Sequence, residues 1–202
     1  DTVLHNVKLA AEKSNILEEN ELTGKSFAIA TCHRAENTND THRLKSILDT
    51  FNEIAAKGTL IVFPMHPRTK NMLPNVLPDW SPHENLRVIE PVGYLDMLQL
   101  VAEAQMALPD SGGLQKEAFF LNTPCITMRD ETEWVETIEA GANIITSADA
   151  SQIMDAYQHW IEKGAVDFSE EVRKYFGDAD SAGLTLKVIL EFLLQKTPAT
   201  AQ

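Results

Sequence analysis

Ala107-Leu108-Pro109-Asp110-Ser111-Gly112-Gly113-Leu114-Gln115-Lys116-Glu117-Ala118 is the stretch on which the interpretation of the whole chain depends. It predicts the end of a buried strand, a tight turn at Gly112 and Gly113, and the first turns of a helix. Two residues without side chains let a ligand approach the backbone closely, and Ser111 is a good helix N-cap. Because amides of a first helical turn point outward at the positive end of the helix dipole, the stretch predicts an anion site.

Glu117 lies one to two turns into the predicted helix, where its carboxylate would suit sugar hydroxyls rather than phosphate. The alternative interpretation of the stretch is an ordinary strand-to-helix turn with a capping residue, since short glycine-rich turns are weak signals by themselves. The rest of the chain has to decide between the two.

Composition limits the class of protein. The 202 residues suffice for one good core, and a hydrophobic fraction of 44% with 23% charged residues is ordinary for a globular domain. The net charge of −13 argues against nucleic acid or an anionic membrane as the main partner. We find no signal peptide and no span-length apolar run. Cys32 and Cys125 sit in apolar runs, which predicts buried free thiols of a reducing, cytoplasmic compartment.

Strands and helices alternate along the whole chain, which predicts an α/β fold with a parallel sheet covered on both faces. The expected strands are 26–32, 59–65, 86–89, 105–108, 125–128 and 142–145, and the expected helices are 2–18, 44–55, 94–102, 114–121, 134–140, 153–161 and 181–195, with a short helix before Leu77. We expect residues 1–195 to form one Rossmann-like domain, with 196–202 as a flexible tail. A start at Asp1, directly in a helical pattern, suggests a piece of a longer chain.

Polar loops follow several of the predicted strands, and in such sheets ligands bind outside the carboxyl ends of the strands. The loops that begin at His33, His66 and Arg129 should therefore converge beside Ser111. Together they offer the cations Arg34, Arg68, Lys70 and Arg129, the histidines His33 and His66, and the carboxylates Glu36, Glu117 and Glu133. Guanidinium groups suit phosphate oxygens.

Each of these side chains also has a plainer interpretation. A single loop arginine is most often only solvated, His66 could be a structural histidine bonded to backbone, and Glu36 could simply cap its loop. The fingerprints G-x-G-x-x-G and G-x-x-x-x-G-K-[ST] are absent, and no Cys or His spacing suits a metal. We therefore expect no dehydrogenase, no P-loop NTPase, no cofactor and no metal.

Four motifs occur in an order that resembles the carboxyl-terminal half of the non-hydrolysing UDP-N-acetylglucosamine 2-epimerases. They are Thr31-Cys32-His33-Arg34-Ala35-Glu36-Asn37, Pro64-Met65-His66-Pro67-Arg68, Asp110-Ser111-Gly112-Gly113-Leu114-Gln115-Lys116-Glu117-Ala118 and Arg129-Asp130-Glu131-Thr132-Glu133. Each motif alone is weak, but four in register are specific, and the resemblance covers roughly residues 1 to 195.

The resemblance implies a GT-B-like protein of two Rossmann-like domains that acts on a UDP-sugar in the cleft between them and is dimeric when intact. UDP would leave the sugar to give a 2-acetamidoglucal and add back on the other face, which inverts C2. The residues it assigns to UDP-sugar binding are Ser111, Gly112 and Gly113 on the diphosphate, Glu117 on the ribose, the segment from Pro91 to Tyr94 on uracil, and His66, Arg68, Arg129 and Glu133 on the diphosphate and sugar side. It assigns catalysis to His33, with Arg34 and Glu36.

The chain departs from the family pattern in two respects. The amino-terminal domain and its catalytic carboxylates have no matching positions, so we expect this chain alone to fold and bind UDP weakly but not to turn over, and its apolar last helix to pack partly on the missing domain. Glu131-Thr132-Glu133-Trp134-Val135-Glu136 departs from the family's usual Thr-Glu-Arg-Pro and looks more like relatives that act on UDP-diacetamido-uronic acids. UDP-N-acetylglucosamine remains the first choice.

Three other functions stay open. One is a hydrolysing epimerase or the donor domain of a GT-B glycosyltransferase, although His33-Arg34-Ala35-Glu36-Asn37 argues against a transferase. Another is a non-catalytic module that senses a UDP-sugar, and the last is a purely structural role.

Overall fold

The computed structural model describes residues 2–177 and 180–196, and within them six strands form one parallel sheet. The strands are β1 (Phe27–Ala30), β2 (Leu60–Pro64), β3 (Leu86–Ile89), β4 (Met106–Leu108), β5 (Cys125–Thr127) and β6 (Asn143–Ile145). Their order across the sheet is β3-β2-β1-β4-β5-β6, and every neighbouring pair is parallel. This is the doubly wound order of a Rossmann-like sheet, and it confirms the predicted α/β class.

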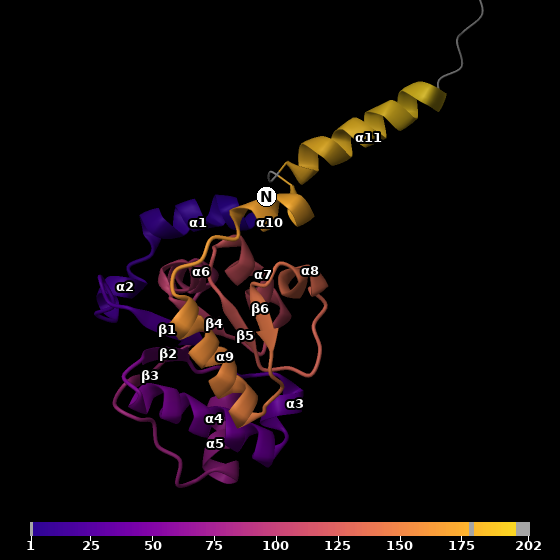
Figure 1. The fold of residues 1–202 in the computed structure, drawn as a ribbon. Coiled ribbons are helices and arrows are strands. Elements are labelled where there is room, and N and C mark those ends of the chain that lie inside the picture. The colour runs from indigo at the N-terminus through magenta and orange to yellow at the C-terminus, as the bar shows by residue number, and fades with distance from the viewer. Residues whose placement is uncertain (1, 178–179, 197–202) are drawn as a thin grey trace, which may run out of the picture.

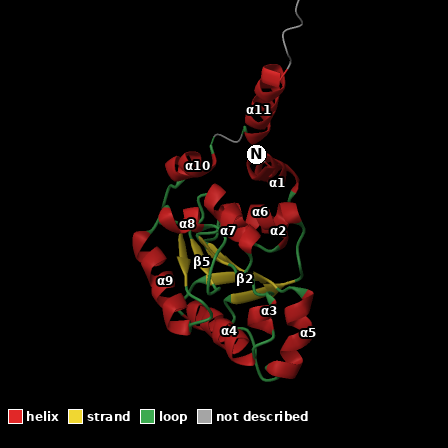
Figure 2. Ribbon diagram, turned by 90° about the vertical axis from the view of Figure 1, so that its right-hand side faces the viewer, coloured by secondary structure: helices red, strands yellow, loops and turns green. Residues whose placement is uncertain are grey.

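The short apolar runs become strands because both faces of the sheet are covered (Figure 2). In β1, Phe27 and Ile29 belong to one buried cluster and Ala28 and Ala30 to the other, as the two-residue period of a strand requires. Fully burying a large apolar side chain contributes roughly 1.5–3 kcal/mol. A sheet that is apolar on both faces is therefore stable only between two layers of helices.

Helices cover both faces of the sheet (Figures 1 and 2). Residues of α4 (Thr41–Ala56) and α9 (Ala150–Lys163) pack in one core cluster, and residues of α2 (Ile16–Glu19), α6 (Tyr94–Glu103) and α7 (Gly112–Phe120) pack in the other. The remaining helices are α1 (Thr2–Lys13) against α6, α3 (Ala35–Thr38) and α5 (Pro67–Val76) next to each other, α8 (Val135–Glu139) beside α7, and α10 (Ser169–Phe176).

Two local predictions were wrong, and one helix was missed. The helix expected over 2–18 is two helices, because the Ser14 hydroxyl accepts from the Ile16 N–H at 3.3 Å and donates to Asp96 Oδ1 at 2.6 Å, which restarts the chain at α2. The loop after β1 contains a helical turn, α3. Helix α10 was not predicted, although Phe168 and Val172 follow helical spacing and are buried.

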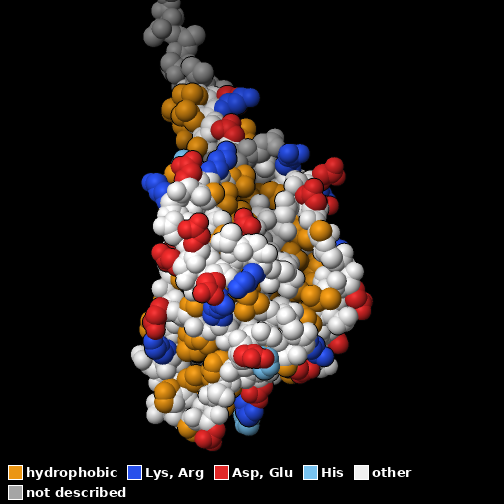
Figure 3. Space-filling view, turned by 90° about the vertical axis from the view of Figure 1, so that its left-hand side faces the viewer, with side chains coloured by type: hydrophobic (Ala, Val, Ile, Leu, Met, Phe, Trp, Pro, Cys, Tyr) orange, Lys and Arg blue, Asp and Glu red, His pale blue; other side chains and the backbone are white. Residues whose placement is uncertain are grey.

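The last helix, α11 (Ser181–Lys196), projects from the body of the molecule (Figures 1 and 3). Its large apolar side chains Leu184, Leu186, Val188, Ile189, Leu190, Phe192 and Leu193 are exposed. The helix itself was predicted correctly, and its packing on a further domain stays a prediction. The predicted tail beyond Lys196 lies outside the described residues.

Two predictions about class can be compared with the structure. Cys32 and Cys125 are buried free thiols, as expected. In the described part of the chain, no helix combines the length and apolarity needed to cross a membrane.

Candidate functional site

The candidate site lies where the strand order reverses, between the neighbouring strands β1 and β4. In doubly wound sheets this switch point opens a crevice outside the carboxyl ends of the two strands. The loop that leaves β1 begins at Thr31, whose N–H donates to the Leu108 carbonyl of β4 at 3.0 Å. The His33 motif and the Asp110-Ser111 turn are therefore adjacent.

Asp110, at the end of β4, joins these two loops. Its side chain is fully buried, and Oδ2 accepts from the backbone N–H groups of His33 and Arg34, both at 2.7 Å. The Asn37 amide donates to the Met128 carbonyl at 3.0 Å, which ties the same loop to β5. Sequence reasoning gave neither Asp110 nor Asn37 a role, although both stand inside the quoted motifs.

His33 and His66 come together above the ends of β1 and β2. Their rings stack with centroids 5.1 Å apart and an interplanar angle of 25°. His66 is also the N-cap of α5, where its Nδ1 accepts from the Arg68 N–H at 3.1 Å. The interpretation of His66 as a structural histidine bonded to backbone therefore holds for its Nδ1, while its ring stacks on His33.

The remaining cations of the β2 loop are already paired. Arg68 donates to Thr38 Oγ1 and to Asn39 Oδ1, each at 3.0 Å. Lys70 pairs with Glu90 at 2.5 Å on the exposed surface. Arg68 therefore joins the β2 loop to the β1 loop, whereas Lys70 faces away to the neighbouring strand β3.

The helix α7 starts earlier than predicted, at Gly112, so the two glycines form its first turn rather than a turn before it. Ser111 occupies the N-cap position, as predicted, and its side chain makes no capping hydrogen bond to the described residues. A Cβ built on Gly113 would meet no described heavy atom within 4 Å. Since the first amides of a helix have no intrahelical acceptor, this end of α7 is open to an anion.

Arg129 lies beside the same helix end. It is only 4% exposed, and its two outer nitrogens donate to the Glu133 carboxylate at 2.8 and 3.1 Å. Glu36 Oε1 lies 3.6 Å from Arg129 Nε. The hydrogen bonds to Glu133 raise the pKa of Arg129 and lower the pKa of Glu133. A Cβ on Gly112 would lie 3.1 Å from Glu133 Oε2 and 3.5 Å from Arg129 Nη1, so the Arg129–Glu133 ion pair adjoins the helix end.

Glu36 also approaches the cation that precedes it, since its Oε1 lies 4.0 Å from Arg34 Nε. The loops after β1 and β5 therefore form an alternating row of charges, with Arg34, Glu36, Arg129 and Glu133 in that order. The predicted convergence of these side chains is present.

Glu117 in α7 and Tyr94 at the start of α6 lie next to each other. The Tyr94 hydroxyl and the Glu117 carboxylate share a hydrogen bond, and burial raises the pKa of both groups. Because Tyr94 begins α6, this contact brings the segment from Pro91 to Tyr94 next to the half-buried carboxylate of α7.

Gln115 is a buried residue that sequence reasoning missed. Its Nε2 donates to the Ser111 carbonyl at 3.2 Å, and its Oε1 accepts from Thr132 Oγ1 at 2.5 Å and Asn143 Nδ2 at 3.3 Å. It fixes the 129–134 loop against the start of α7. A polar residue on the buried stripe of a predicted helix was the available signal.

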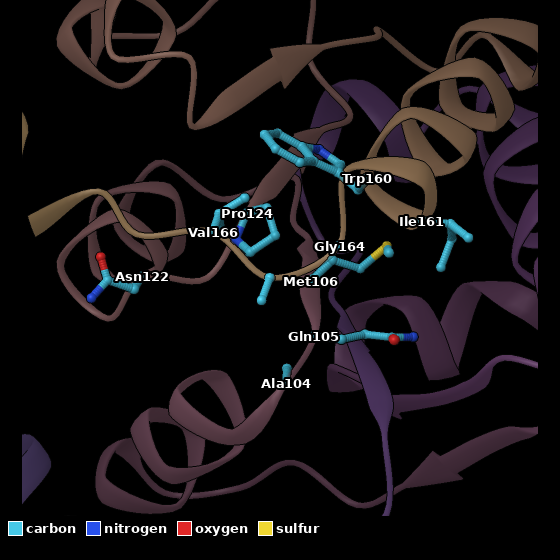
Figure 4. A pocket seen from close by; sticks show the side chains of 10 residues that line it. Ala104, Gln105, Met106, Asn122, Pro124, Trp160, Ile161, Gly164 and Val166 are labelled. Carbon is cyan, nitrogen blue, oxygen red and sulfur yellow. The ribbon is translucent and has the colours of Figure 1, made fainter.

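One cavity lies away from these loops. About 380 Å³ in volume, it is lined by Gln105, Met106, Trp160 and Val166 among others, at the amino end of β4 (Figure 4). The predicted site residues do not line it. In the described residues, no group of three or more His, Cys, Asp or Glu side chains could hold a metal ion. The candidate site is thus an open, polar edge of the sheet.

Comparison with known proteins decides the family. Residues 1–190 match the family described as UDP-N-acetylglucosamine 2-epimerase. The chain belongs to this family. A UDP-N-acetylglucosamine 2-epimerase homologue of Methanococcus maripaludis is 38% identical over 192 residues, which are 94% of this chain and 52% of the relative. The chain spans about half the length of the curated relatives it matches over nearly its whole length.

Solved epimerases share the fold. The Methanocaldococcus jannaschii UDP-GlcNAc 2-epimerase in complex with UDP-GlcNAc and UDP superposes with a TM-score of 0.79 at 34% identity, over 94% of this chain and 52% of that one.

A second sequence relative has a different named substrate. A UDP-2,3-diacetamido-2,3-dideoxy-D-glucuronate 2-epimerase of Pseudomonas aeruginosa is 45% identical over 130 residues, which are 64% of this chain and 36% of the relative.

Proposed function

We propose that this chain is the nucleotide-binding half of a UDP-sugar 2-epimerase and that it binds UDP across the ends of β1 and β4. The observation that carries the proposal is the uncapped, glycine-lined start of α7 beside the buried Arg129. Helix amides and a fixed guanidinium suit a diphosphate. The related Methanocaldococcus jannaschii structure in complex with UDP-GlcNAc and UDP supports the choice of ligand.

The proposed contacts follow the charges of the site. The Ser111 hydroxyl and the amides of Gly112 and Gly113 hold the diphosphate, with Arg129 beside them and Glu133 orienting the guanidinium. Glu117 accepts from the ribose hydroxyls, because a half-buried carboxylate is a strong acceptor, and the Pro91–Tyr94 backbone contacts uracil. His66 and Arg68 face the sugar side.

The proposed reaction inverts C2 of the sugar. The C1–O bond to UDP breaks and the C2 proton is removed, which leaves a 2-acetamidoglucal, and UDP then adds back with a proton delivered to the other face of C2. His33, with Arg34 and Glu36, lies where UDP departs. Donors fixed around the diphosphate stabilise the charge that develops on it, and such preorganised donors are usually the largest catalytic contribution.

We further propose that these 202 residues alone bind UDP without turnover and that the intact enzyme is a homodimer. The family's carboxylates that handle the C2 proton have no matching positions in this chain. Measurable epimerisation of UDP-N-acetylglucosamine by the purified 202-residue chain would contradict the first part, and sedimentation of an intact relative as a monomer the second.

UDP-N-acetylglucosamine is the first choice of substrate, and a UDP-diacetamido-uronic acid is the second. The second is favoured by the 45% identity to the Pseudomonas aeruginosa enzyme and by the segment from Glu131 to Glu136. In that segment, the ring of Trp134 packs against Lys116 of α7, whose Nζ lies 4.3 Å from the ring centroid. Competition between the two UDP-sugars for binding would rank them.

Calorimetric titration with UDP tests the proposed function. We expect the folded wild-type chain to bind and the Ser111→Ala, Glu117→Ala variant to bind roughly 30- to 1,000-fold more weakly, since one neutral and one charged hydrogen bond are worth about 2–4 kcal/mol together. Ser151→Ala, Asp155→Ala on the exposed face of α9 is the matched control and should bind as wild type. A folded wild type that does not bind UDP, or binding that the first variant retains, would overturn the proposal.

A further inference from the structure

We propose that Asp110 is the positioning residue of His33: it holds the imidazole in the Nδ1–H form and leaves Nε2 as the nitrogen available to the ligand. The inference deepens the proposed function, on which it rests for the identity of that ligand. It concerns a contact between the end of β4 and the loop after β1, 77 residues apart in the chain.

The two oxygens of Asp110 have different surroundings. Oδ2 accepts the two backbone N–H groups of His33 and Arg34 at 2.7 Å, which places the loop. Oδ1 is buried and has no hydrogen-bond partner among the described residues, and His33 Nδ1 lies 3.3 Å from it. A buried carboxylate oxygen left without a donor is costly, so this separation marks Nδ1–H as the donor for Oδ1.

The form of the ring follows from the chemistry of the two groups. A carboxylate only accepts hydrogen bonds, and a neutral imidazole has one N–H and one lone pair. If Nδ1 carries the hydrogen toward Asp110, the lone pair is on Nε2. Nε2 can then take a proton and return it, while Asp110 stabilises the imidazolium that forms in between.

Other contacts around the pair do not supply this effect. The His66 ring stacks on His33 but uses its own Nδ1 as an acceptor for Arg68. The Cys32 thiol also lies against Asp110 and donates a hydrogen bond to its carboxylate. Burial, then the charge of Asp110 and this hydrogen bond, raise the pKa of Cys32, so the thiol stays protonated and has no effect on which ring nitrogen of His33 carries the hydrogen. The carboxylate is thus the group that can select the form of His33.

The same chain contains reference histidines of the opposite kind. His66 Nδ1 accepts from the Arg68 N–H and His83 Nδ1 from the Asn85 N–H, each at 3.1 Å. Both rings therefore carry their hydrogen on Nε2 when neutral. The inference predicts that neutral His33, in contrast to these two, carries its hydrogen on Nδ1.

Asp110→Asn separates positioning from loop structure. The amide oxygen of Asn can accept the two backbone N–H groups in place of Oδ2, which turns its NH₂ toward His33. A donor in that place requires a lone pair on Nδ1, so the ring should switch to the Nε2–H form while the loop keeps its anchor. The same logic explains loss of activity when a buried Asp beside a catalytic histidine becomes Asn.

The test is the imidazole ¹⁵N spectrum of the ¹⁵N-labelled 202-residue chain at about pH 8.5, roughly two units above the ordinary imidazole pKa. We expect the Nδ1–H form of His33 in roughly tenfold excess, the ratio one good hydrogen bond to a charged group supplies. His66 and His83 should show the opposite pattern. His33→Gln assigns the signal, Asp110→Asn should reverse it, and Asp130→Asn, an exposed carboxylate paired with Arg43, should leave it unchanged.

A wild-type His33 in the Nε2–H form would overturn the inference without any variant, and so would a folded Asp110→Asn chain whose His33 pattern is unchanged. The spectra need no ligand. Failure of UDP binding would therefore refute the proposed function separately.

Discussion

Gly113→Ala should stabilise the fold and weaken UDP binding at the same time. Gly113 is the second residue of α7, and a Cβ built on it has open space within 4 Å of the described heavy atoms. Its φ is not in the left-handed region, so alanine fits the backbone. Glycine in a helix costs roughly 0.5–1 kcal/mol relative to alanine.

The expected changes in folding stability and in UDP affinity have opposite signs. In a first helical turn about half of that propensity applies, so we expect a gain of about 0.5 kcal/mol and a rise in Tm of roughly 1–2 °C for a chain of this size. The added methyl would stand over the open amides where we propose the diphosphate lies. Because the diphosphate could then no longer approach these amides closely, the Kd of UDP should rise by at least roughly tenfold, which is about 1.4 kcal/mol of binding free energy.

Thermal unfolding and calorimetric titration on the same samples measure the two effects. Ser151→Ala is the matched control, because it makes an alanine at the second residue of α9, a helix that Asp149 caps and that lies away from the proposed site. It should change Tm by less and UDP affinity not at all. A Gly113→Ala chain that binds UDP as tightly as wild type would show that the open helix end is not the diphosphate site.

Three further predictions concern side chains around the same edge. Burial raises the pKa of Glu117, so the favourable contribution of this side chain to folding is present below its unfolded pKa of about 4.3 and is lost as the pH rises through the higher folded pKa. In urea unfolding, Glu117→Gln should therefore be more stable than wild type at pH 7 and equally stable near pH 4. A stability difference that does not depend on pH would count against this prediction. Burial raises the pKa of Cys125 to about 12, which leaves roughly one thiolate in 10⁴ thiols at pH 8. A disulfide reagent should therefore label Cys125 only after the chain unfolds. Rapid labelling of the native chain would contradict this burial. Arg129→Lys cannot make the paired hydrogen bonds to Glu133 and should weaken UDP binding by roughly tenfold with the far-UV spectrum unchanged, whereas unchanged affinity would remove Arg129 from the site.

The sequence by itself determined the elements and the class of fold. Runs such as Phe27–Ala30 and Leu60–Pro64 are apolar without strict alternation, and that pattern is a local property of a strand buried on both faces. The amphipathic period of α4 and α9 is equally local. Local pattern failed where a side chain acted on its neighbour's backbone, as at Ser14, and where a helix was short and mostly polar, as in α10.

Only the tertiary structure decided which loops form the site and which residues hold them. The order β3-β2-β1-β4-β5-β6 makes β1 and β4 neighbours, and that adjacency brings Asp110 to His33. In the same way Gln115 reaches Asn143 and Arg129 reaches Glu36. Hydrophobic period is set residue by residue along the chain, whereas a buried polar group takes whichever partner the packed strands bring within hydrogen-bond distance, and no spacing in the sequence encodes that distance.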